Sequence, residues 1–136
     1  PSMVARNNGK ILNTSSTAAL IPGPLQAVYF ASKAYVSSFS NALAEELHDK
    51  NITVTALLPG ATETGFAKTS GVDKTAIFSN PASARSVAED GYNAMIKGKL
   101  DIVSVSSRSQ KIQLSLVPLF PKKMILKTTR QMQEEK

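Results

Sequence analysis

The feature that most constrains the fold of this chain is a strand, a long helix and a second strand in succession. The first strand, "KILNTSS" at residues 10–16, has an apolar pair that leads into small polar residues. Residues 27–50 contain no helix breaker, and "ITVTALLPG" at residues 52–60 is a β-branched apolar run that ends in Pro59 and Gly60. This order predicts an α/β fold with parallel strands, whose carboxyl ends lie at one edge of the sheet.

The rest of the chain continues the alternation of helix and strand. The expected elements are a helix at residues 83–99, a strand at 100–106 and two amphipathic helices at 109–120 and 121–136. Ser83 and Gly98 are the expected ends of the first of these helices, and Pro118 and Pro121 separate the last two. Residues 61–81 are rich in Gly and Thr, which predicts a mobile flap or binding loop.

Residues 27–50 predict the longest element of the chain, a helix that we expect to be well buried. Its apolar residues recur at helical spacing, and they are Val28, Ala31, Tyr35, Phe39, Ala42 and Leu43. The other faces carry many Ala and Ser residues, so that a neighbouring element can approach on more than one side. This pattern differs from that of a helix with one wet face.

Composition excludes several classes of site. The chain has no Cys and a single His, His48, so that no disulfide, thiolate nucleophile or Cys- or His-based metal site is expected. No apolar run approaches the roughly 20 residues of a membrane span, and the first ten residues lack a signal-peptide core. A cytoplasmic location is therefore the default expectation.

The formal charge of +6 is confined to the end of the chain. After residue 96, nine basic residues face three acidic ones, and the basic residues are scattered among large apolar ones. This pattern is typical of solvated faces of amphipathic helices, so no nucleic-acid partner is expected. The segment "PKKMILKTTR" at residues 121–130 leaves a second reading open, a helix that lies on an anionic membrane surface.

Three groups of polar side chains are expected to meet at the carboxyl edge of the sheet. They are the hydroxyl of Ser15 or Ser16, the pair Tyr29 and Lys33, and the turn Pro59–Gly60 with Thr62 and Thr64. Tyr29 and Lys33 are one helical turn apart and share a face. A phenol is a poor base near neutral pH, and a nearby ammonium favours its ionised form. A serine, a tyrosine and a lysine can thus form an acid and base set.

These segments together resemble the short-chain dehydrogenase/reductase family. The resemblance runs through "GKILNTSS", the Pro-x-Pro of the next loop, "AVYFASKAYVSSFSNALAEEL", "ITVTALLPG" and "TET", in the order and spacing of the family. It selects Ser16, which lies thirteen residues before Tyr29, and leaves Ser15 as a structural neighbour. The family's fold implies part of a Rossmann-like doubly wound parallel sheet with three α/β/α layers.

The resemblance also implies the roles of the site residues. Ser16 would orient the oxygen of a carbonyl or secondary alcohol, and Tyr29 would exchange its proton. Lys33 would favour the ionised tyrosine and bind the nicotinamide ribose. Further cofactor contacts would come from Pro59, Gly60, Thr62 and Thr64. The expected reaction is hydride transfer between NAD or NADP and a small-molecule substrate.

The sequence departs from the family in what it lacks. The glycine-rich phosphate turn, Thr-Gly-x-x-x-Gly-x-Gly, has no match in the 136 residues, and neither does the family's Asn-Asn-Ala-Gly segment. We therefore interpret residues 1–136 as the carboxyl-terminal half of one Rossmann-like domain, a fragment without the amino-terminal dinucleotide-binding strands. Such a fragment would bind the cofactor poorly and would be inactive alone.

Two further expectations concern partners and substrate. The helix at residues 27–50 would pair with its counterpart in a second copy, as is common in the family. An alternative function follows from this, namely a non-catalytic truncated module that acts in dimerisation or binding. The flap at residues 61–81 and the terminal helices would shape the substrate pocket, where Phe66, Ile77 and Phe78 favour an apolar ligand.

Overall fold

The fold is built on three parallel strands. The structure is a computed structural model, and it describes residues 2–71, 75 and 78–134. Strands β1 (Gly9–Thr14), β2 (Ile52–Pro59) and β5 (Asp101–Ser104) form a sheet in the order β1-β2-β5, which confirms the predicted parallel arrangement. The central strand β2 is the most apolar of the three and is almost wholly buried.

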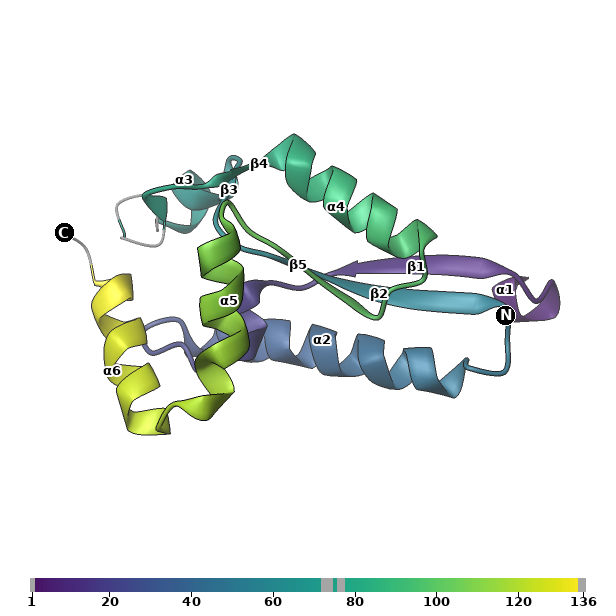
Figure 1. The fold of residues 1–136 in the computed structure, drawn as a ribbon, viewed down its shortest axis with the longest axis horizontal. Helices are drawn as coiled ribbons and strands as arrows, with labels where there is room; N and C mark the ends of the chain where they lie inside the picture. The colour runs from purple at the N-terminus through teal and green to yellow at the C-terminus, as the bar shows by residue number, and fades with distance from the viewer. Residues whose placement is uncertain (1, 72–74, 76–77, 135–136) are drawn as a thin grey trace.

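Two helices cover the opposite faces of this sheet (Figure 1). Helix α2 (Ala27–Glu46) packs on one face, and helix α4 (Ala84–Ile96) packs on the other. Ser83 caps α4 by accepting a hydrogen bond from the amide of Ser86, and Gly98 follows its end with a φ of +63°. The three α/β/α layers confirm the predicted fold class.

The core lies between α4 and the sheet. Leu57, Ala82 and Val87 are buried together, and Leu12 and Ile102 pack against them. A side chain at Gly91 of α4 would approach Leu57 within 2.8 Å, so this glycine lets the helix lie close to the sheet. Close packing here holds β1, β2 and β5 in register and so aligns the ends of β1 and β2.

The predicted burial of the long helix was wrong for the single chain. Only Phe30 and Ser40 of α2 are buried, whereas Val28 is 86% exposed and Tyr35 is 68% exposed. The helical spacing of the apolar residues was right, but most of them point away from the sheet. The small polar residues Ser37 and Ser40 face β1 and its end instead. The helix also ends at Glu46 and not at residue 50, where the chain continues as a turn.

The remaining elements are short or lie near the carboxyl terminus. They are α1 (Ser2–Ala5), η1 (Thr17–Leu20), β3 (Thr62–Glu63), α3 (Phe66–Ser70), β4 (Ala82–Ser83), α5 (Arg108–Leu116), η3 (Val117–Leu119) and α6 (Lys122–Gln133). Strands β3 and β4 pair with each other, and the amide of Ala82 donates to the carbonyl of Ala61. This pairing ties together the two ends of the predicted flap.

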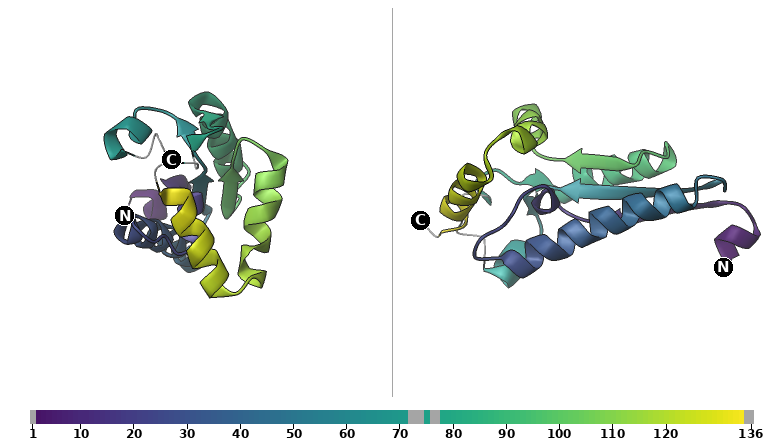
Figure 2. Two further views of the ribbon diagram at one scale, coloured as in Figure 1. Left: turned by 90° about the vertical axis from the view of Figure 1, so that its left-hand side faces the viewer. Right: turned by 90° about the horizontal axis from the view of Figure 1, so that it is seen from below.

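Helices α5 and α6 confirm the two predicted terminal helices, and they stand at the end of the sheet where β1 and β2 finish (Figure 2). No helix among the described residues is long and apolar enough to cross a membrane.

Candidate functional site

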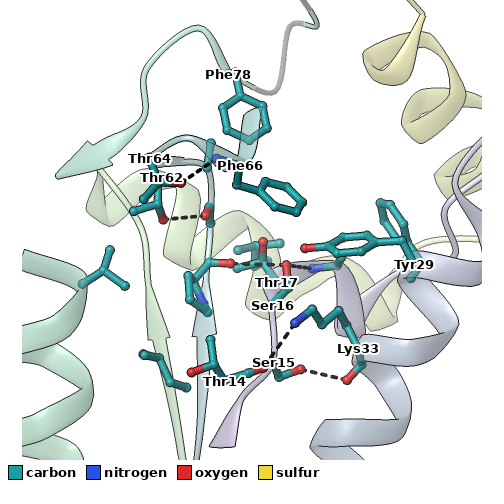
Figure 3. A pocket seen from close by; sticks show the side chains of 18 of the residues that line it. Thr14, Ser15, Ser16, Thr17, Tyr29, Lys33, Thr62, Thr64, Phe66 and Phe78 are labelled. Atoms are coloured by element: carbon teal, nitrogen blue, oxygen red, sulfur yellow. Dashed lines mark hydrogen bonds between the residues drawn. The ribbon is translucent and has the colours of Figure 1, made fainter. Parts of the chain in front are cut away.

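A cavity of about 510 Å³ opens at the carboxyl ends of β1 and β2 (Figure 3). Its lining includes every residue that the sequence predicted for the site, namely Ser16, Tyr29, Lys33, Pro59, Gly60, Thr62 and Thr64. These residues come from three separate segments, which the parallel pairing of β1 with β2 brings to one edge. The volume lies within the range of about 300–1,000 Å³ that is usual for small-molecule sites.

Ser15 and Ser16 follow β1 directly and have opposite surroundings. Ser15 is 3% exposed, and its hydroxyl donates to the carbonyl of Lys33 over 2.8 Å while it accepts from the hydroxyl of Ser37 over 2.8 Å. These bonds fasten the end of β1 to α2. The sequence had left Ser15 as a structural neighbour, and its hydrogen bonding fits that role. Ser37, the second serine of this clamp, was not anticipated from the sequence.

The hydroxyl of Ser16 lies at the cavity. It accepts a hydrogen bond from the amide of Ala18 over 3.1 Å and so caps η1. Its one acceptor among the described residues is the carbonyl of Pro59, at 3.4 Å, which is long for a hydroxyl donor. Because this bond is weak, little energy is lost when the hydrogen turns toward a ligand oxygen.

Tyr29 and Lys33 project from the first turns of α2 toward the cavity (Figure 3). The ammonium nitrogen of Lys33 lies 5.8 Å from the centre of the Tyr29 ring and donates to the carbonyl of Thr14 over 3.3 Å. The Tyr29 ring packs against two aromatic rings, edge to face with Phe30 at 5.9 Å and tilted against Phe66 at 5.8 Å. The predicted pair is therefore brought together, with the phenol held between aromatic neighbours.

The turn after β2 forms the adjacent wall of the cavity. The amide of Gly60 donates to the carbonyl of Ser104, and a side chain at Gly60 would meet Val105 at 2.9 Å. The hydroxyl of Thr62 donates to the carbonyl of Gly60 over 3.0 Å. The hydroxyl of Thr64 accepts from the amide of Phe66 over 3.3 Å, so that it positions the start of α3.

The rest of the lining is mainly apolar and includes residues that sequence reasoning missed. Among the described residues that line the cavity, Lys33 is the only one with a formal charge. Apolar side chains come from the loop after β1, from α2, from the flap and from the terminal helices, and they include Ile21, Phe30, Phe66, Phe78, Leu114 and Met132. Ile77, which the sequence also placed in this wall, lies outside the described residues.

Three glutamine side chains, Gln26, Gln110 and Gln133, also line the cavity and were not anticipated. They lie at an amino-terminal cap and on the two terminal helices, where nothing in the local pattern distinguishes them from surface residues. No group of three or more acidic, His or Cys residues that could hold a metal occurs in the described part of the chain.

Comparisons with known proteins agree with this arrangement. A sequence model of the short chain dehydrogenase family matches residues 1–75. The very-long-chain 3-oxoacyl-CoA reductase of Rattus norvegicus is 47% identical over 68 residues, which are 50% of this chain and 22% of that protein. The 17-beta-hydroxysteroid dehydrogenase type 3 of Mus musculus is 48% identical over 66 residues, which are 48% of this chain and 22% of that protein.

Solved structures show the same fold. A short-chain dehydrogenase from Sphingobium yanoikuyae in complex with NADPH has a TM-score of 0.68 and 24% identity, over 88% of this chain and 47% of that one. A 7beta-hydroxysteroid dehydrogenase has a TM-score of 0.74 and 16% identity, over 95% of this chain and 49% of that one. This chain thus spans about half the length of each of these structures. Because the family's sequence model matches more than half of its residues, the chain belongs to the short-chain dehydrogenase family, a family of oxidoreductases.

Proposed function

We propose that this chain is the catalytic half of an NAD(P)-dependent oxidoreductase that interconverts a carbonyl and a secondary alcohol. One observation carries the proposal, namely that Ser16, Tyr29 and Lys33 line a single cavity together with the turn after β2. Curated relatives named as a reductase and as a hydroxysteroid dehydrogenase support the reaction class. Solved neighbours described with NADPH, NADP and NAD support a nicotinamide cofactor and leave the choice between NAD and NADP open.

The donors of the cavity fit the nicotinamide end of such a cofactor. An ammonium has three donors, and the bond of Lys33 to Thr14, its one hydrogen bond within the described part of the chain, leaves two donors for the hydroxyls of a ribose. Pro59, Gly60, Thr62 and Thr64 form the facing wall. No glycine-rich phosphate turn occurs in the sequence, so the pyrophosphate would be held by residues outside this chain. When bound, the nicotinamide supplies or accepts the hydride.

The three side chains would divide the work of proton transfer and positioning. Ser16 directs its weakly held hydroxyl hydrogen to the substrate oxygen, where negative charge develops during reduction. Tyr29 gives its proton to that oxygen and is left as a phenolate. The ammonium of Lys33 stabilises the phenolate, and in the direction of oxidation the same groups act in reverse.

We further propose that the substrate is apolar beyond its reacting carbon. The walls of the cavity are aromatic and aliphatic, with Phe30, Phe66, Phe78 and Leu114 among them. The names of the curated relatives refer to very-long-chain 3-oxoacyl-CoA and to hydroxysteroids, and both kinds of compound agree with an apolar substrate class. A site of this kind gains affinity from buried apolar area and orientation from a few polar groups.

The test compares two tyrosines of the same helix in the complete open reading frame that contains this chain. Tyr29→Phe is expected to lower turnover with NADH or NADPH and an apolar ketone by about 100- to 10,000-fold, the usual contribution of acid and base catalysis. Tyr35→Phe removes the same hydroxyl from a side chain that points to solvent, and it is expected to leave turnover within about twofold. Equal activity of the two variants would refute the role of Tyr29.

A second candidate function, a dimerisation module, is favoured by the outward face of α2. We propose that this face, with Val28, Tyr35 and Phe39 exposed, pairs with a second copy of the chain. Val28→Glu is then expected to shift the sedimentation coefficient from dimer to monomer, whereas Tyr92→Glu on α4 is not. A dimer that shows no turnover with either cofactor would favour the non-catalytic module over the enzyme.

A further inference from the structure

Helices α5 and α6 and the turn between them form a hairpin at the end of the sheet where β1 and β2 finish (Figures 1 and 2). We call residues 108–134 the terminal hairpin. Its surface is unusually apolar for a part of the chain in contact with water. The exposed large apolar side chains are Ile112, Leu116, Leu119, Phe120, Met124, Leu126 and Met132.

The most exposed of these side chains, Leu119, lies at the tip of the hairpin. Leu119 is 78% exposed, and its neighbour Phe120 is 47% exposed. Ile112 and Leu116 precede them on one stripe of α5 at a spacing of four residues, so that the apolar surface is continuous from α5 into the turn.

Basic residues surround this apolar surface. The terminal hairpin contains six Lys and Arg residues and one acidic residue, Glu134. Lys122 and Lys123 follow the tip after Pro121, and Lys123, Lys127 and Arg130 share one face of α6. Among the described residues, Arg130 is the one cation of the hairpin with an acidic partner, Glu134 at 3.0 Å. The other five cations have no acidic partner within the described part of the chain, so they can meet an external anion.

We propose that the terminal hairpin docks on an anionic membrane surface, with Leu119 and Phe120 inserted and the lysines at the lipid headgroups. An apolar tip bordered by cations matches the two layers of such a surface, acyl chains below and phosphates above. A second copy of the hairpin would bring two basic surfaces together, which is unfavourable. The outward face of α2 lacks this pattern, because the one cation of α2, Lys33, is half-buried at the cavity.

Helices α5 and α6 of the terminal hairpin also form part of the cavity wall. Leu114 of α5 and Met132 of α6 line the cavity from one side. A membrane under the terminal hairpin would thus lie next to the apolar wall of the site, and an apolar substrate could pass from the bilayer to the cavity. This consequence rests on the proposed function, whereas docking itself does not.

The first test is co-sedimentation of the protein with vesicles of phosphatidylcholine alone or mixed with phosphatidylserine. Binding is expected only to the mixed vesicles, and it should weaken with added salt. Lys122→Glu with Lys123→Glu should lower binding by at least about 25-fold, because each cation near an anionic surface contributes about fivefold. Lys97→Glu with Lys99→Glu makes the same charge change outside the terminal hairpin and should lower binding much less. Equal losses in the two double variants would overturn the proposal.

A second measurement reports insertion directly. The 136 residues contain no tryptophan, so Phe120→Trp adds a single fluorescent probe at the tip. Its emission should shift to shorter wavelength with mixed vesicles, while a Tyr92→Trp probe on α4 should not shift. An unshifted Phe120→Trp spectrum would overturn the insertion.

The oligomeric state tests the alternative, a contact between two copies of the hairpin. If the protein self-associates and the double variant Leu119→Ser with Phe120→Ser does not, the tip is a contact between copies and the membrane proposal is overturned. Tyr29→Phe should bind vesicles normally, which separates docking from the proposed catalysis.

Discussion

The packing of Gly23 on Phe30 supports a sharp prediction about the loop that precedes the site. A β-carbon at Gly23 would lie 2.1 Å from Cγ, 2.2 Å from Cδ2 and 2.4 Å from Cδ1 of the Phe30 ring. Carbon atoms normally approach to about 3.5–4.0 Å, so the ring would have to move by roughly 1 Å or more. Since Cγ joins the ring to the chain, rotation of the ring cannot relieve the contact. Phe30 is 7% exposed, and neighbouring side chains limit its displacement.

Gly23→Ala is therefore expected to lower the free energy of unfolding by about 2–3 kcal/mol, at the upper end of the usual effect of overpacking. Gly65→Ala is the matched control, because Gly65 has a φ of −64° and no atom within 4 Å of a new β-carbon. Its effect should stay below about 1 kcal/mol. Urea unfolding followed by circular dichroism measures both variants. Equal midpoints for the two would refute the argument, and Phe30→Leu should partly rescue Gly23→Ala.

Three further predictions follow from contacts near the site. Ser15→Ala and Ser37→Ala should each lower the free energy of unfolding in urea by about 1 kcal/mol. The double variant should lower it by less than the sum of the two, because the two hydroxyls share one hydrogen bond. Strictly additive losses would contradict this. Gly91→Ala should change stability by less than about 1 kcal/mol, because the closest atom to the new β-carbon is a terminal methyl group of Leu57, which a change of rotamer can move, and because alanine favours the helix. A loss as large as that of Gly23→Ala would be inconsistent with it. Glu134→Gln removes an exposed ion pair and should alter the melting temperature by no more than about 2 °C; a larger fall would show that the pair stabilises α6.

Most of the fold could be predicted from the sequence because its strands and helices have unambiguous local signals. The β-branched run of β2 and the serine cap of α4 both specify their elements locally. The exposure of α2 could not be predicted in the same way. Val28 and Phe30 are both apolar, and the sequence alone does not say which of them is buried. That choice is made by tertiary contacts such as the packing of Gly23 on Phe30.

The polar residues of the candidate site could be predicted from the sequence, whereas other residues of its lining could not. Its polar residues follow strand ends or share one helical turn, so that topology alone brings Ser16, Tyr29 and Lys33 together. The glutamines of the lining have no such relation to the strands. Gln110 and Gln133 reach the cavity only because α5 and α6 fold back over it, which depends on contacts distant in sequence. The catalytic and cofactor roles of the lining residues remain predictions until the tyrosine variants are assayed.

The contrast between Ser15 and Ser16 shows how one backbone segment holds two neighbouring hydroxyls in different ways. Side chains alternate in direction along extended backbone, and Ser16 is extended, with φ −168° and ψ 159°. Ser15 therefore points to α2, where its hydroxyl both donates and accepts a short hydrogen bond. Ser16 points to the cavity, where its one donated bond is long. A shift of one residue in the end of β1 would exchange the two positions. The same pairing of β1 with β2 that stabilises the sheet thus determines which hydroxyl is held tightly against α2 and which is held only weakly.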